Sequence, residues 1–258
     1  ALYISADRGL VEFVQSLIAA GADIDQVSKD GWRPIHAAAS NGHLDIVKYL
    51  VDHNADINSQ TDFGFTALQV AVLNKHSTVV EYLLKQKANH TIKNEVGRTA
   101  LHLACQSNSV DMFKIIYRFC IQSDICCTDD DQYNCLHIAA ESGQTEIVKL
   151  LMKTKKFSVN SQTNDGSTAL YLAAAGGNLE TVKSLVKTYK ADVNLPENDG
   201  WSPLHIAAQE GHTEIIKVLV NAGANFETKT KEGHKAVEIA DHNGHKDIAQ
   251  VIRRQRIM

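Results

Sequence analysis

The stretch Pro34-Ile35-His36-Ala37-Ala38-Ala39 returns in altered form along the whole chain of 258 residues. The residues at the place of His36 are Tyr3, His36, Gln69, His102, His137, Tyr171, His205 and Glu238. Their successive intervals are therefore 33, 33, 33, 35, 34, 34 and 33 residues, which makes eight copies. A fixed period of this size is typical of stacked supersecondary units rather than of one globular core.

Within one copy, the pattern predicts a helix, a turn, a second helix and a polar extended finger. In the second copy Pro34 suits a first helical turn, because its missing N–H has no partner there in any case. Gly42 ends that helix, and residues 44–51 place apolar side chains at the spacing of an amphipathic helix. Residues 54–58 then turn the chain outward. Helices this short need their neighbours, since isolated helices below about 12 residues are marginal in water.

Glycine recurs just before the motif, as at Gly31, and between the two helices, as at Gly42. Both places suit a residue with positive φ, which glycine adopts without a Cβ clash. The third and fourth copies depart most from this pattern, because Lys75 and Asn108 replace the glycine between the helices and Lys87 replaces the glycine after the second helix. The interval of 35 residues also requires two extra residues, which we place in a longer finger over residues 121–131.

The run 199–208 (DGWSPLHIAA), with GH at 211–212 and GA at 223–224, resembles the ankyrin repeat, and the resemblance extends over essentially the whole chain. It implies an all-α repeat solenoid of helix-turn-helix pairs with β-hairpin finger loops. It also implies a concave surface, made of fingertips and first helices, that binds other proteins. We expect a single domain over residues 1–258, with repeats at approximately 1–29, 30–62, 63–95, 96–130, 131–164, 165–198, 199–231 and 232–258.

Composition narrows the class of protein further. A net charge of −4 and a pI near 6.3 argue against a nucleic-acid-binding protein, which usually carries a strongly basic face. No apolar run approaches the roughly 18 residues of a membrane span, and no signal peptide is recognisable. We therefore expect an intracellular, cytoplasmic and monomeric chain that does not bind nucleic acid, does not insert into a membrane and carries no cofactor, with nuclear or membrane-associated localisation through other domains as the alternative.

The motif histidines do not indicate catalysis. His36, His102, His137 and His205 hold the same place in four copies, where Tyr or Gln substitutes in others. This recurrence favours a structural role, in which each histidine ties the finger backbone to the first helix by hydrogen bonds. No nucleophile motif and no phosphate-binding glycine-rich loop accompanies them, so the sequence does not predict an enzyme.

The cysteines raise the question of a metal site. No Cys-x-x-Cys pair occurs, whereas a structural zinc site normally has paired ligands with two to four residues between them. The spacing therefore predicts no metal site, and it favours reduced structural thiols, with redox sensing as the alternative. The five cysteines are Cys105, Cys120, Cys126, Cys127 and Cys135.

A stacked series of side chains follows the finger glycine and is the candidate binding stripe. Four of its seven members are aromatic, although aromatic residues make up only 6% of the chain. Tryptophan, tyrosine and arginine dominate interaction hot spots, so we expect this stripe to bind a partner, with Phe63 and Leu73 beside it. The alternative is that these aromatics only pack on adjacent fingers. The series is Trp32, Phe65, Arg98, Tyr133, Ser167, Trp201 and His234.

Carboxylates surround the stripe and form an acidic rim. The partner is therefore expected to be a protein segment that is both basic and apolar. The rim residues are Asp30, Asp62, Glu95, Asp130, Asp131, Asp165, Asp199, Glu210 and Glu232.

Two classes of function fit this surface. In the first, the chain is a protein–protein interaction module that acts as scaffold, adaptor or inhibitor. In the second, it is the regulatory or targeting arm of a longer enzyme or ion channel, because the first copy starts inside its motif.

The sequence also contains a candidate modification site. The spacing of Leu50 and Asn58 is similar to the hairpin pattern that an asparaginyl hydroxylase modifies in ankyrin proteins, which makes Asn58 the candidate residue.

Overall fold

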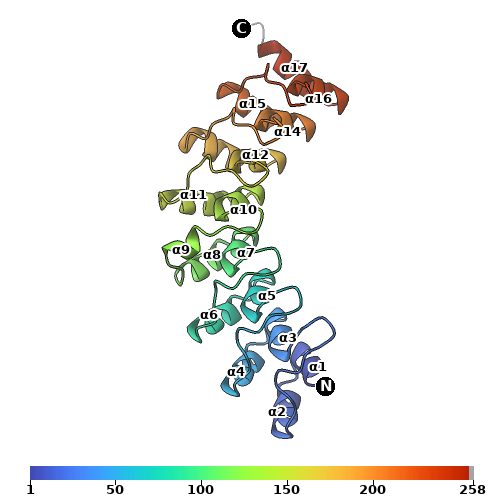
Figure 1. Cartoon of the computed structure of the whole chain (residues 1–258), viewed down its shortest axis with the longest axis vertical. Coiled ribbons are helices and arrows are strands. Elements are labelled where there is room, and N and C mark those ends of the chain that lie inside the picture. Colours follow the sequence, from blue (N-terminus) through green and yellow to red (C-terminus); the bar gives the residue numbers. More distant parts are fainter. Residues whose placement is uncertain (256–258) are drawn as a thin grey trace. The chain divides into compact units, whose positions relative to one another are not determined.

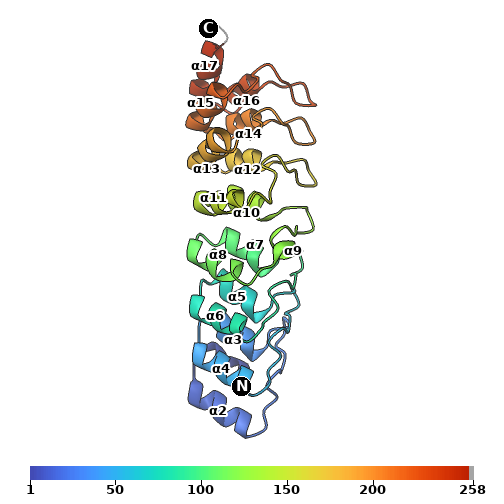
Figure 2. The ribbon, with the colours of Figure 1, turned by 90° about the vertical axis from the view of Figure 1, so that its left-hand side faces the viewer.

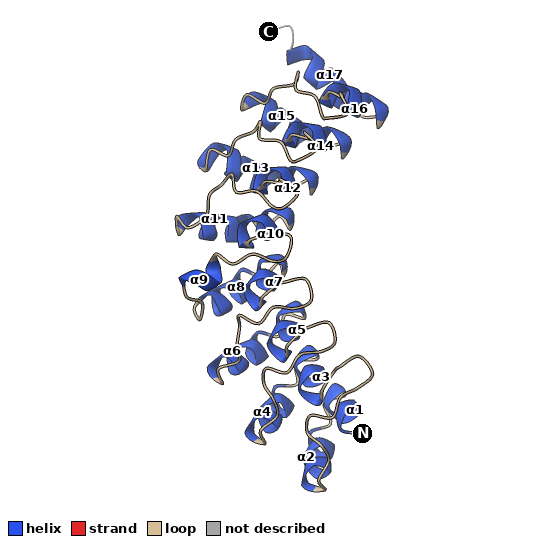
Figure 3. Ribbon diagram, viewed as in Figure 1, coloured by secondary structure: helices blue, strands red, loops and turns tan. Residues whose placement is uncertain are grey.

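The computed structural model describes residues 1–255, and the chain divides into two compact units, residues 1–130 and 131–258. Both units consist of helix pairs joined by loops (Figures 1 and 3). The expectation of a single domain stays a prediction, and the last three residues of its final repeat lie outside the described residues.

In the first unit, successive first helices pack side by side, and so do successive second helices. The finger loops project to the side away from the second helices (Figure 2). The first helices are α1 (Leu2–Asp7), α3 (Pro34–Ser40), α5 (Ala67–Leu73) and α7 (Ala100–Gln106). The second helices are α2 (Val11–Ala19), α4 (Leu44–Asp52), α6 (Ser77–Lys85) and α8 (Val110–Tyr117), and the short helix α9 (Gln122–Ile125) lies within a finger.

The second unit repeats this arrangement with the same two rows of helices. Its second row contains one irregular member, since α13 continues directly into a π-helical turn, η1 (Ser184–Thr188). The first helices are α10 (Cys135–Glu141), α12 (Ala169–Ala175), α14 (Pro203–Gln209) and α16 (Ala236–His242). The second helices are α11 (Thr145–Lys153), α13 (Leu179–Lys183), α15 (Thr213–Asn221) and α17 (Lys246–Gln255).

The helices form where the apolar pattern predicts them, as α3 and α4 show. Pro34 is the first residue of α3, and every residue from 34 to 39 is buried. Ile46, Val47 and Leu50 of α4 are fully buried against neighbouring helices. Each such side chain contributes about 1.5–3 kcal/mol by burial. These contacts stabilise helices of seven and nine residues that are marginal alone.

The fingers are tighter than the expected β-hairpins. In residues 1–255 they contain no strand, only isolated antiparallel bridges such as Gln60 with Thr66 and Gln162 with Thr168. The finger segment is too short for a strand. Its turn closes by a hydrogen bond from the Thr61 N–H to the Phe65 carbonyl (2.9 Å), and the next residue, Thr66, already caps α5. One bridge is all that this short segment accommodates.

Neighbouring fingertips contact each other through the backbone. In the first unit the Glu95 N–H donates to the Phe63 carbonyl at 3.1 Å, and in the second unit the Lys231 N–H donates to the Asp199 carbonyl at 2.9 Å. Gly64 permits this approach, since it has φ of 75° and a Cβ there would lie 2.8 Å from the backbone nitrogen of Glu95. The glycine before the motif thus serves both turn geometry and finger packing.

The expected departures from glycine are real backbone features. Lys75, Lys87 and Asn108 adopt φ of 63°, 64° and 53°, as the sequence pattern predicts. The longer finger after α8 is also confirmed, and α9 forms within it. None of the helices in the described part of the chain has the length and apolar character that crossing a bilayer demands.

Candidate functional site

The four motif histidines tie their own first helices to the following fingers, as predicted. His36 accepts the backbone N–H of Arg33 at Nδ1 (3.0 Å), and its Nε2 lies 2.9 Å from the Ser59 carbonyl oxygen. Because a backbone N–H only donates, Nδ1 is the acceptor, and Nε2 carries the proton that it donates to Ser59. The same two bonds recur, with Nε2 to carbonyl distances of 3.1, 2.9 and 3.1 Å, at His102, His137 and His205.

Gln69 performs the same task without an imidazole. Its Oε1 accepts the backbone N–H of Thr66 at 2.9 Å. Its Nε2 donates to the carbonyl oxygens of Ile92 and Arg98 at 2.8 and 3.0 Å. A side-chain amide has an acceptor and a donor at opposite corners, as the neutral imidazole has, so this substitution preserves the tie.

Burial lowers the pKa of three of these imidazoles and so favours their neutral form. It lowers the pKa of His36 to about 4, and the hydrogen bond to the Ser59 carbonyl only partly opposes this effect. Burial likewise lowers the pKa of His102 to about 4, against an opposing bond to the Cys127 carbonyl, and it lowers the pKa of His205. Neutral imidazoles with both nitrogens occupied by backbone groups are structural, which confirms the interpretation drawn from their recurrence.

A second set of histidines, which the sequence reasoning missed, ties consecutive repeats. His76 follows the turn between α5 and α6, and its Nε2 lies 2.9 Å from the Ser40 carbonyl at the end of α3. Its ring covers Gly42, which explains why a residue without Cβ stands there. In the second unit, the amide of Asn178 takes this place and donates to the Ala140 carbonyl. The other histidines of this set are His43, His212 and His245.

The aromatic members of the stripe are half-buried rather than fully exposed. Trp32 packs edge-on against His36, with ring centroids 6.0 Å apart at 73°. The pairs of Tyr133 with His137 and of Trp201 with His205 repeat this geometry at 6.0 and 6.2 Å. In these three repeats the aromatic ring therefore packs on the buried histidine four residues further on, a contact that the sequence reasoning did not foresee. Elsewhere in the series Ser167 is buried and His234 is exposed.

In the first unit, the exposed apolar surface lies at the fingertips. Phe63 is 54% exposed, and Val96, which holds the same place in the next finger, is 55% exposed. Leu73, at the end of α5, is 41% exposed. Arg98 differs from these, because its guanidinium Nε donates to the nearly buried carboxylate of Asp129 at 3.0 Å. Sequence reasoning missed Val96 because valine at this one position forms no recurring pattern.

In the second unit, Trp201 lies between two hollows. The larger, of about 470 Å³, is lined by Trp201, Ile239 and the carboxylates of Glu232 and Glu238, among others. The smaller, of about 220 Å³, is lined by Trp201, Tyr171, Glu197 and Asp199, among others. Burial, and then the negative charges of Glu197 and Asp165, raise the pKa of Tyr171 to about 12. The indole of Trp201 is therefore bordered by two hollows whose walls carry carboxylates.

Comparison with protein families agrees with this architecture. The family described as "Ankyrin repeats (3 copies)" matches the chain in six overlapping stretches, residues 2–94, 55–123, 87–163, 118–197, 146–230 and 174–256. The chain belongs to the ankyrin repeat family. Comparison with curated proteins finds no matching sequence. These matches confirm the expected fold class. Ankyrin repeats are in general protein–protein interaction modules without catalytic activity, and the expected function is confirmed at this coarse level.

The predicted acidic rim of the ankyrin fingers is exposed to solvent. Its carboxylates lie at or beside the fingertips, except that of Glu210, which follows the last residue of α14. Asp199 forms a long ion pair with Lys231 (3.8 Å). The partner-binding roles of the stripe and of the rim stay predictions. The exposed rim residues are Asp30, Asp62, Glu95, Asp130, Asp131, Asp165, Asp199, Glu210 and Glu232.

Asn58, the candidate modification site, connects two fingers. Its side-chain oxygen accepts the backbone N–H of Asn89 at 2.8 Å. The carboxylate of Asp25 does the same for the Asp56 N–H at 3.3 Å, and Asn194 does so for the Asn225 N–H at 2.7 Å. This recurrence gives the residue a structural role, and its modification stays a prediction.

The cysteines fall into two groups. Cys105 and Cys135 are buried in first helices, as structural thiols are expected to be. Cys120, Cys126 and Cys127 lie in the inserted finger after α8 and are at least partly accessible. Within residues 1–255 all five are thiols rather than disulfides.

Proposed function

We propose that this chain is a protein–protein interaction module that holds a basic and apolar partner segment against its finger surface. It would act as a scaffold, adaptor or inhibitor. The observation that carries this proposal is Trp201, which separates two hollows lined by carboxylates.

The chemistry of these hollows matches a lysine or arginine side chain. The half-buried indole of Trp201 offers apolar surface to an aliphatic stem, and the nearly buried Ile239 lies in the wall of the larger hollow. Glu232 and Glu238 offer negative charge to the cationic end, and a cation over an indole face gains further attraction. Tryptophan and arginine are among the residues that dominate interaction hot spots when a surrounding rim excludes water. An acidic partner segment would be repelled at the same place.

A selection from random displayed peptides tests the proposal directly. We expect the intact chain to enrich peptides in which lysine or arginine adjoins an aromatic or branched aliphatic residue. Trp201→Ala should weaken the enriched peptides about 30-fold in fluorescence anisotropy, the loss typical of a hot-spot residue. Glu232→Gln should weaken binding less and should reduce its dependence on salt.

Two control variants match these changes outside the finger surface. Phe13→Ala removes an aromatic ring that is 64% exposed on α2, and Glu214→Gln removes a carboxylate that pairs with Lys217 on α15. Both should bind the peptides as the unchanged chain does. If Trp201→Ala retains full affinity, or if the selected peptides are acidic, the proposal is wrong.

A further inference from the structure

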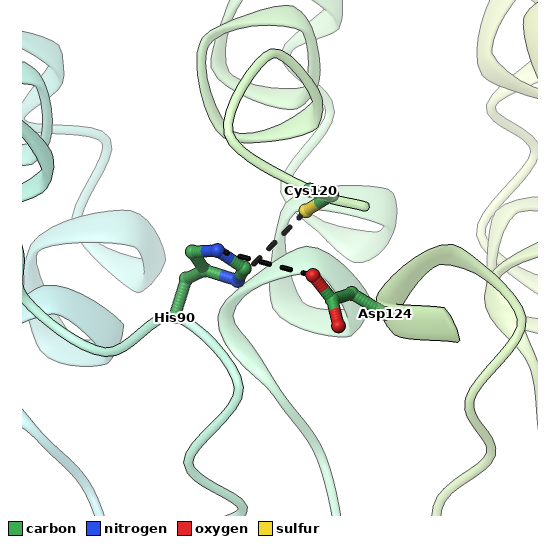
Figure 4. Close-up of side chains that lie close together, drawn as sticks. All are labelled: His90, Cys120 and Asp124. Carbon is green, nitrogen blue, oxygen red and sulfur yellow. Dashed lines mark hydrogen bonds and ion pairs between the residues drawn. The ribbon is translucent and has the colours of Figure 1, made fainter. Parts of the chain in front are cut away.

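The finger inserted after α8 brings together three side chains of metal-binding type. His90 comes from the finger after α6, Cys120 lies just beyond α8, and Asp124 belongs to α9. The three side chains point toward one another (Figure 4). One candidate ligand atom from each lies within 4.8 Å of those of the other two. All three belong to the first unit.

The separations are close to those of a tetrahedral zinc site. His90 Nδ1 lies 4.0 Å from Cys120 Sγ, and His90 Nε2 lies 4.0 Å from Asp124 Oδ2. With bonds of about 2.0–2.3 Å to nitrogen, oxygen and sulfur, tetrahedral ligand atoms lie roughly 3.3–3.6 Å apart. These two contacts use different nitrogens of the imidazole, whereas a single ion takes one of them. One atom from each residue already lies within 4.8 Å of the other two, so side-chain rotations that shorten these separations bring one ring nitrogen, the thiolate and a carboxylate oxygen onto a single ion.

The surroundings provide space and partial shielding from water. The side chains of His90 and Asp124 are only 18% and 16% exposed. Together with Cys120 and Cys127 they line a cavity of about 110 Å³, which has room for an ion and a water molecule. Lys93 also lines this cavity, and its ammonium donates to the Thr128 carbonyl at 2.8 Å. Its single positive charge is outweighed by one thiolate and one carboxylate.

We propose that His90, Cys120 and Asp124 bind a zinc ion, with water as the fourth ligand. The mixed set of nitrogen, sulfur and oxygen suits zinc, whereas calcium and magnesium prefer oxygen alone. Binding releases the thiol proton of Cys120 to solvent, because the thiolate is the ligand. The proposal does not depend on the protein-binding function, since it uses none of the finger-surface residues named for that function.

Cobalt substitution and zinc competition on the intact, metal-stripped chain test the site. We expect one zinc ion per chain, measured by competition with a chromophoric chelator. Cobalt should give a sulfur-to-metal charge-transfer band and the intense visible bands of four-coordination. Cys120→Ser should abolish the charge-transfer band. His90→Ala and Asp124→Asn should each weaken zinc binding more than about tenfold, since even loss of an outer-shell partner costs that much.

Cys126→Ser is the matched control, because Cys126 is an exposed thiol of the same finger that does not line the cavity. It should bind both metals as the unchanged chain does. Alkylation followed by mass spectrometry adds a readout that needs no variant, since zinc should protect Cys120 and leave Cys126 reactive. The proposal is overturned if the chain binds no stoichiometric zinc, if zinc leaves Cys120 unprotected, or if Cys126→Ser loses the cobalt band.

Discussion

The fingers that follow α4 and α8 are each fixed by a hydrogen bond from the motif histidine of the same repeat, but they differ in length. His36 reaches the carbonyl of Ser59, 23 residues further on, and His102 reaches the carbonyl of Cys127, 25 residues further on. Both imidazoles are fully buried, and burial lowers the pKa of each to about 4. The two extra residues lie between α8 and the tied carbonyl, where α9 forms.

This difference shows where a repeat tolerates change. The imidazole fixes one carbonyl of the finger, and the chain between the second helix and that carbonyl is free to lengthen. In the finger after α8 this segment carries Cys120 and Asp124, which approach His90 of the preceding finger. The recurring hydrogen bonds hold the scaffold, and the cluster of His90, Cys120 and Asp124 depends on the insertion.

Acidification should have the largest effect, and it should act on both fingers alike. The unfolded histidine has a pKa of 6.5, and His36 and His102 have folded values of about 4. Between these values the unfolded chain binds more protons, so the free energy of unfolding falls as the pH falls from about 6.5 to 4. At pH 5 the loss is about 2 kcal/mol for each imidazole, or about 4 kcal/mol for the pair. Urea unfolding followed by circular dichroism at pH 7.5 and pH 5 measures it.

The control for this experiment is the double variant His36→Gln and His102→Gln. Glutamine does not titrate, so the double variant should lose markedly less stability between the two pH values. His205 continues to contribute, because burial lowers its pKa as well. An unchanged pH dependence in the double variant would mean that other groups cause the acid loss.

Removal of either imidazole should be the next largest effect. His36→Ala leaves the Arg33 N–H and the Ser59 carbonyl without their partner, and His102→Ala does the same in the inserted finger. Two unsatisfied backbone groups and a cavity should cost about 3 kcal/mol at neutral pH in either case. The midpoint of urea unfolding measures this loss.

Glutamine is again the matched control, because Gln69 already makes both bonds in the repeat between them. His36→Gln and His102→Gln should retain most of the stability that the alanine variants lose. If His102→Ala costs much less than His36→Ala, the inserted finger does not depend on its tie, and the equivalence of the two fingers is wrong.

Much of this arrangement was predictable from the sequence because it repeats. The bounds of α3 and α4 follow from the apolar spacing between Pro34 and Gly42 and beyond. The structural role of His36 follows from its return at a fixed interval, and so does the left-handed backbone at Lys75. Recurrence identifies what every unit requires, whatever the partner.

The features that sequence reasoning missed depend on contacts between repeats or occur only once. His76 binds a carbonyl 36 residues earlier, and no pattern within one repeat indicates that partner. His90 and Cys120 meet only after the insertion has folded, because 30 residues separate them. Their spacing resembles no zinc motif, so the spacing of the cysteines in the sequence did not indicate this cluster. The edge-on contact of Trp201 with His205 likewise requires side-chain orientations.

The smallest expected effect concerns the turn between the two helices of each repeat. The repeat of His36 has Gly42 there with φ of 75°, and the repeat of His102 has Asn108 with φ of 53°. Asn108→Gly should raise stability by about 0.5 kcal/mol, because asparagine tolerates this conformation better than most residues and little strain remains to be relieved. Gly42→Asn should lower it by about 1–2 kcal/mol, since its Cβ would meet the ring of His76. Equal and opposite shifts in the urea midpoint would show that the ring of His76 imposes no constraint and that backbone preference alone separates the two turns.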